Sequence, residues 1–99
     1  MKKNFKLPLK TLDKTPFQEN GKDVLLSSIC IHALGFTDPQ GPKLPHDEHL
    51  KRFKLASKIH DAEDEIDVTV EELALLKTVI VSVGYGPLVV GSAFQILEE

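Results

Sequence analysis

The last third of the chain, residues 69–97, constrains the fold most because it contains two nearly all-apolar stretches separated only by Gly84-Tyr85-Gly86-Pro87. Apolar residues almost all the way round a helix indicate that the helix is buried. Neither stretch approaches the roughly 20 residues of a membrane span, and the glycines and proline interrupt the run. We therefore predict two helices, over 69–83 and 87–97, folded back on each other as a helical hairpin that forms the core.

The ends of these two helices carry specific signals. Thr69 and Glu72 have the spacing of a capping box, in which each side chain accepts a hydrogen bond from the backbone N–H of the other residue. Gly84 can end the first helix in a left-handed conformation, and Pro87 suits the first turn of the next helix, where its missing N–H costs nothing.

Residues 1–20 are predicted to be an extended arm or a short β-hairpin. Phe5, Leu7 and Leu9 alternate with polar residues or proline, which is a strand pattern. Asp13-Lys14 is the expected hairpin tip, and the prolines on either side restrict both arms to edge or irregular positions.

A turn at residues 19–21 leads into a helix predicted over 23–35, with Asp23 as its N-cap. His32 on this mostly apolar helix indicates a core histidine that is hydrogen-bonded rather than a ligand. Gly35 ends the helix, and the proline-rich stretch 36–46 is predicted to be a loop.

The next segment, 47–62, has the periodicity of an amphipathic helix. Its expected buried stripe consists of Leu50, Phe53, Ala56 and Ile59. The expected outer face is basic and consists of Lys51, Arg52, Lys54 and Lys58. The predicted fold class is therefore mainly α (α+β), as one domain over residues 1–99 with about four helices.

Charge is unevenly distributed over the 99 residues, whose net charge is −3. Residues 61–72 carry seven acidic side chains and no basic one. Such blocks are typical of solvated faces, so we interpret 61–72 as an acidic linker.

The single cysteine, Cys30, lies in an apolar run and is predicted to be a buried thiol. No apolar segment follows the basic N-terminus as in a signal peptide, so a cytoplasmic location is expected.

The sequence holds two clusters of potential metal ligands. His46 and His49 can share one face at a helix start, but a zinc site needs at least one more ligand. Residues 61–72 place oxygen-bearing side chains in the order of a calcium-binding EF-hand loop, but Ile66 stands where that loop needs glycine. No cofactor is predicted, and a degenerate calcium module remains an alternative with the candidate ligands Asp61, Glu63, Glu65, Asp67 and Glu72.

Four pieces of the sequence carry a family resemblance: Asp23–Leu26, Lys51–Ile59, Glu71–Lys77 and Gly84–Gly91. In this order they resemble a group of small, uncharacterised proteins encoded by tailed bacteriophages and prophages. The resemblance implies a viral protein made in the bacterial cytoplasm, and it carries over no functional residue.

The sequence contains no Ser-His-Asp order, no glycine-rich phosphate loop and no paired catalytic carboxylates, so no enzyme activity is predicted. The hypothesis is a non-enzymatic phage protein that binds another protein or itself, in virion assembly or in modulation of a host factor. A small domain with more apolar residues than its core can bury leaves some of them exposed, and an exposed apolar patch is typical of a binding surface. The candidate contact residues are Phe36, Leu88, Val89, Phe94 and Leu97. The alternative is a nucleic-acid-associated regulator that uses the basic face at Lys51, Arg52, Lys54 and Lys58.

Overall fold

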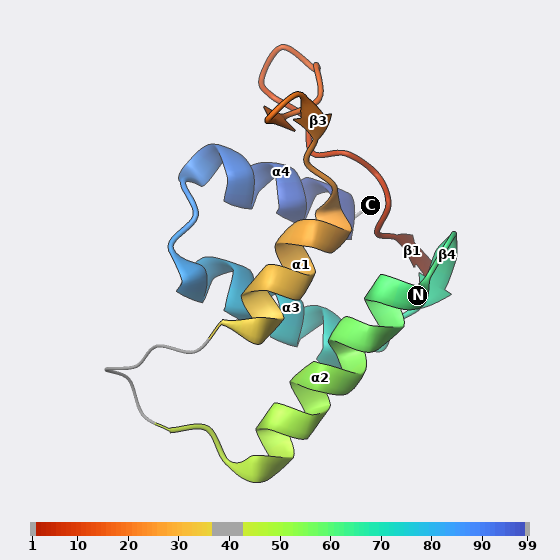
Figure 1. The fold of residues 1–99 in the computed structure, drawn as a ribbon, viewed down its shortest axis with the longest axis vertical. Helices are drawn as coiled ribbons and strands as arrows, with labels where there is room; N and C mark the ends of the chain where they lie inside the picture. Colours follow the sequence, from red (N-terminus) through yellow and green to blue (C-terminus); the bar gives the residue numbers. More distant parts are fainter. Residues whose placement is uncertain (1, 37–42, 99) are drawn as a thin grey trace.

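The computed structural model describes residues 2–36 and 43–98, and within them the chain is mainly helical, as predicted (Figure 1). The described residues form four helices and four short strands. The helices are α1 (Leu26–Gly35), α2 (His46–Asp61), α3 (Val70–Val83) and α4 (Pro87–Glu98). The strands are β1 (Lys2–Asn4), β2 (Gln18–Glu19), β3 (Lys22–Asp23) and β4 (Glu65–Asp67). Residues 37–42 of the expected loop 36–46 lie outside the described residues.

The predicted N-terminal hairpin is confirmed. Its tip lies at residues 11–15, where the Thr11 N–H donates to the Thr15 carbonyl over 2.8 Å. Asn20 and Gly21 then take positive φ values of 54° and 78° and link β2 to β3. Two successive positive φ values define a tight hairpin turn that favours Asn-Gly.

Asp23 is not the N-cap of α1, which corrects the sequence prediction. It lies in β3, where its Oδ1 accepts a hydrogen bond from Gln18 Nε2 over 3.1 Å. The helix begins later, at Leu26, and Leu25 occupies the N-cap position without a side-chain hydrogen bond. The Leu26 N–H instead donates to the Leu7 carbonyl. The N-terminal arm therefore provides an acceptor for one of the N–H groups that have no partner within the helix.

The segment read as an acidic linker contains a strand. Residues 65–67 form β4, which pairs antiparallel with β1, and Ile66 lies opposite Lys3. Extended backbone at this point does not wrap around an ion as an EF-hand loop does. A pairing between residues more than 60 positions apart leaves no local signal in the sequence.

The C-terminal hairpin has the predicted ends. The Glu72 N–H donates to Thr69 Oγ1 over 3.0 Å, and the Thr69 N–H donates to Glu72 Oε1 over 2.9 Å, which completes the capping box. Gly84 ends α3 in the left-handed conformation with a φ of 91°, and Pro87 is the first residue of α4.

Helix α1 lies at the centre of the bundle and packs against both α2 and α3 (Figure 1). One buried cluster draws on all four helices, so the core extends beyond the C-terminal hairpin. Its members are Phe5, Leu9, Leu26, Cys30, Ala33, Leu34, Leu55, Ile59, Val68, Leu76, Val79, Ile80, Ala93 and Leu97. Among the described residues, no helix combines the length and the apolar character needed to cross a bilayer.

Candidate protein-binding site

Helix α2 buries only part of its apolar stripe. Leu55 and Ile59 are buried, as is Ala62 just beyond the helix, but Leu50 is exposed and Phe53 is 69% exposed. The prediction that Leu50 and Phe53 lie in the core is therefore wrong. Each residue turns an α-helix by about 100°, so Phe53 points nearly opposite to Leu55. The core occupies one side of α2, whereas the apolar residues cover more than one side.

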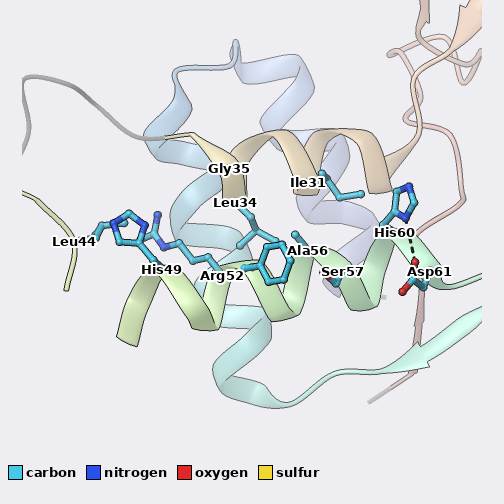
Figure 2. A pocket seen from close by; sticks show the side chains of 11 residues that line it. Ile31, Leu34, Gly35, Leu44, His49, Arg52, Ala56, Ser57, His60 and Asp61 are labelled. Atoms are coloured by element: carbon cyan, nitrogen blue, oxygen red, sulfur yellow. Dashed lines mark hydrogen bonds and ion pairs between the residues drawn. The ribbon is translucent and has the colours of Figure 1, made fainter. Parts of the chain in front are cut away.

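Helices α1 and α2 border a groove of about 450 Å³ (Figure 2). Phe53 is one of its lining residues. The middle of the groove is apolar: Ile31 and Leu34 come from α1, and Ala56 lies across from them on α2. Leu44, just before α2, closes one end. The groove was not predicted from the sequence. Its one signal there is the apolar stripe on α2, which is wider than packing against the core on one side of the helix requires.

The two ends of the groove are polar and differ in charge. His49 and Arg52 lie with Leu44 at one end, and His60 and Asp61 lie at the other (Figure 2). Asp61 follows Arg52 by nine positions, or about 13.5 Å along the helix axis. His60 Nδ1 lies 3.2 Å from Asp61 Oδ1. The groove therefore presents a cation at one end and a carboxylate at the other.

The Arg52 side chain holds a buried hydrogen-bond donor. Its Nε is buried and has no partner among the described residues. A buried donor without an acceptor costs roughly 1–3 kcal/mol.

The basic face predicted on α2 is divided between two grooves. Arg52 lines the α1–α2 groove, whereas Lys51, Lys54 and Lys58 line a second groove between α2 and the start of α3. Three glutamates share that second groove: Glu48, Glu71 and Glu72. Two of the lysines are in ion pairs, Lys58 with Glu72 at 3.3 Å and Lys51 with Glu48 at 3.7 Å. This mixture of charges provides little net attraction for phosphate.

The predicted contact residues, four from the C-terminal hairpin together with Phe36, differ in their exposure. Leu88 is exposed in the first turn of α4, and Phe36 is exposed at the end of α1. Val89 and Phe94 are half-buried and pack against the core. Leu97 is fully buried, which corrects its assignment as a contact residue. Its position at i+4 from Ala93 places both on the side of α4 that faces the core.

The candidate metal ligands come from several elements. His46 and His49 are exposed in the first turn of α2. Asp61 is the last residue of α2, Glu65 and Asp67 belong to β4, and Glu63 is exposed between these two elements. The Glu72 carboxylate accepts a hydrogen bond in the capping box and forms an ion pair with Lys58. Within residues 2–36 and 43–98, no group of three or more His, Cys, Asp or Glu side chains is placed to hold a metal ion.

Cys30 is buried in the core, as predicted. Burial raises the pKa of its thiol to about 12. The thiol is therefore protonated at neutral pH, and a protonated, inaccessible thiol is a poor nucleophile.

A scan against protein-family models, a search of curated proteins and a search of solved structures each gave no match. The function is therefore inferred from the residues and geometry of this chain.

Proposed function

We propose that this chain is a non-enzymatic domain that acts by binding another polypeptide in the α1–α2 groove. The observation that carries the proposal is Phe53, a large aromatic side chain that is 69% exposed beside an apolar groove. Burying a side chain of this kind is worth about 1.5–3 kcal/mol. Exposed aromatic side chains next to a hollow are typical anchors of protein interfaces.

The groove indicates the chemistry of its occupant. A furrow between two helices accepts the ridge of a third helix, whose apolar side chains would cover Ile31, Leu34 and Phe53. The span from His49 to His60 is about 16 Å, which matches about 11 residues of helix. The charges favour an occupant with a carboxylate at the Arg52 end and a cation at the Asp61 end.

The biological setting we propose is a tailed bacteriophage or prophage, with the protein made in the cytoplasm of a bacterial host. This setting rests on the resemblance of four sequence pieces to small phage proteins. Binding would then serve virion assembly or modulation of a host factor.

Site-specific photo-crosslinking tests the binding surface. A photoreactive phenylalanine analogue replaces Phe53 in one variant and Val70 in a matched control. Val70 is also 69% exposed but lies at the start of α3. We expect a protein adduct on irradiation in bacterial cells only from position 53. The proposal is wrong if position 53 gives no protein adduct, or no more than position 70.

A further inference from the structure

We infer that a second site on this chain, between the N-terminal hairpin and α4, binds a small organic anion: a carboxylate or phosphate group joined to an apolar body. Two adjoining hollows of about 390 and 220 Å³ form this site, which we call the arm–α4 cleft. Both hollows are lined by Lys10, Thr11, Lys14, Ser92 and Gln95. The cleft is separate from the α1–α2 groove, so the inference goes beyond the proposed function and does not depend on it.

Hydrogen bonds hold the two walls of the cleft in place. The Lys10 N–H donates to Ser92 Oγ over 2.9 Å, which joins the hairpin to α4. At the hairpin tip the Lys14 N–H donates to the Thr11 carbonyl over 3.0 Å, and the hydroxyl oxygens of Thr11 and Thr15 lie 2.9 Å apart. The cleft is therefore formed before a ligand binds, which lowers the entropy cost of binding.

The cleft is cationic. Lys10 and Lys14 line both hollows, and no carboxylate is among the described residues of their walls. Asp13 is exposed at the hairpin tip but does not line either hollow, and α4 carries no charged side chain from Pro87 to Leu97. The α1–α2 and α2–α3 grooves, in contrast, place carboxylates beside their cations.

The charge of the two lysines is not neutralised within the described chain. Neither ammonium group of Lys10 and Lys14 forms an ion pair with a residue that the structure describes. Two like charges in one cleft repel each other, and an anion between them is attracted by both. The cleft therefore favours a negatively charged group.

Lys14 also has a strained backbone. Its φ of 71° lies in the left-handed region, which favours glycine and asparagine over lysine. Strained residues of this kind concentrate at ligand-binding sites. A lysine in place of glycine destabilises the hairpin tip, and an ammonium group needed in the cleft explains why a lysine is there.

Apolar side chains flank the lysines and indicate the rest of the ligand. Leu7 and Ile96 line the larger hollow, and Leu12 and Leu88 line the smaller one. Leu12 is 81% exposed and Leu88 is 55% exposed, so a hydrocarbon group in the cleft would remove apolar surface from water. The exposed side-chain amide of Gln95 can donate a hydrogen bond to the oxyanion. An apolar wall with a few convergent polar groups is typical of small-molecule sites.

Nuclear magnetic resonance titration of the isotope-labelled full chain tests the inference with hexyl phosphate, hexanoate and hexanol. We expect both anions to shift the backbone amides of Thr11, Gly91 and Gln95 saturably, with a dissociation constant of about 1 mM or lower. Hexanol has the same apolar body without the charge and should bind at least about tenfold more weakly. Binding of either anion supports the inference, and the tighter one identifies the oxyanion.

Variants assign the binding to the two lysines. Lys10→Gln and Lys14→Gln each remove one ammonium group, and we expect each to weaken hexyl phosphate binding by about fivefold or more. Lys22→Gln is the matched control, because Lys22 is exposed in β3 and lines a different hollow. Lys14→Gly also relieves the left-handed backbone, so it should raise the melting temperature by about 2–5 °C while weakening binding.

Four results would overturn the inference. One is the absence of any shift at about 10 mM anion, and another is hexanol binding as tight as that of the anions. A third is wild-type affinity in both Lys10→Gln and Lys14→Gln. The fourth is a set of shifts confined to Ile31 and Ala56, which would place the anion in the α1–α2 groove.

Discussion

Phe53 and Leu55 lie two residues apart on α2, yet Phe53 is 69% exposed and Leu55 only 3%. One side chain faces the groove and solvent, and the other faces the core. Phe53 and Leu55 therefore have different roles. Substitution of Phe53 should affect binding in the groove, and substitution of Leu55 should affect the free energy of unfolding.

Phe53→Ala should leave the free energy of unfolding within about 0.5 kcal/mol of the wild type, because the ring contributes little to the folded monomer. Leu55→Ala should cost about 2–5 kcal/mol, because it opens a cavity in the core. Urea unfolding at low protein concentration measures both. Equal losses in the two variants would mean that Phe53 belongs to the core.

Thr69→Ala should destabilise the protein by about 0.5–2 kcal/mol, because the Glu72 N–H loses its acceptor in the capping box. Thr69→Ser keeps the hydroxyl and is the matched control, with a change of less than about 0.5 kcal/mol expected. Thermal unfolding followed by circular dichroism compares the two. A loss in Thr69→Ser as large as in Thr69→Ala would assign the effect to the threonine methyl group.

Features set by neighbouring residues were predictable from the sequence. The capping box at Thr69 and Glu72, the left-handed Gly84 and the turn before β3 each depend on contacts within a few residues. The residue types needed for these contacts are few, so local patterns are specific.

Features set by distant packing were not predictable. The Asp23 side chain is of a type that caps helices, but Asp23 lies in β3 of a hairpin, and the helix begins at Leu26. Leu50 and Phe53 fit an apolar stripe, and the sequence does not say which part of that stripe α1 covers. The α1–α2 groove therefore required the structure, because a groove is defined by the relative positions of two helices.

The buried thiol of Cys30 should make stability fall at alkaline pH. The unfolded chain releases this proton near pH 8.5–9, whereas the folded chain holds it to about pH 12. The raised folded pKa therefore stabilises the protein below about pH 9, and this stabilisation is lost as the pH rises toward 12. At pH 10.5 the loss amounts to about 2 kcal/mol.

Cys30→Ala separates this effect from other alkaline titrations. The variant is less stable at neutral pH because it leaves a small cavity, but the difference from the wild type should shrink as the pH rises above about 9. Urea midpoints measured at several pH values test this. A difference that does not change with pH would contradict a buried, protonated thiol.

Tyr85 connects the α3–α4 turn to α1 through its hydroxyl, which lies 2.6 Å from Nδ1 of His32. His32 is exposed rather than in the core, but it is hydrogen-bonded as expected. Tyr85→Phe removes this bond and should cost about 0.5–1.5 kcal/mol. A double-mutant cycle with His32→Ala measures the coupling, and zero coupling would show that the contact does not stabilise the turn.

The most direct test of the binding surface is photo-crosslinking in bacterial cells from position 57, which lines the same groove as Phe53, in the wild-type background and in Phe53→Ala. We expect a protein adduct from position 57 when Phe53 is present. In Phe53→Ala the yield of that adduct should fall by about tenfold, because the exposed ring is the main apolar anchor of the groove. Equal yields in the two backgrounds would contradict binding through the α1–α2 groove.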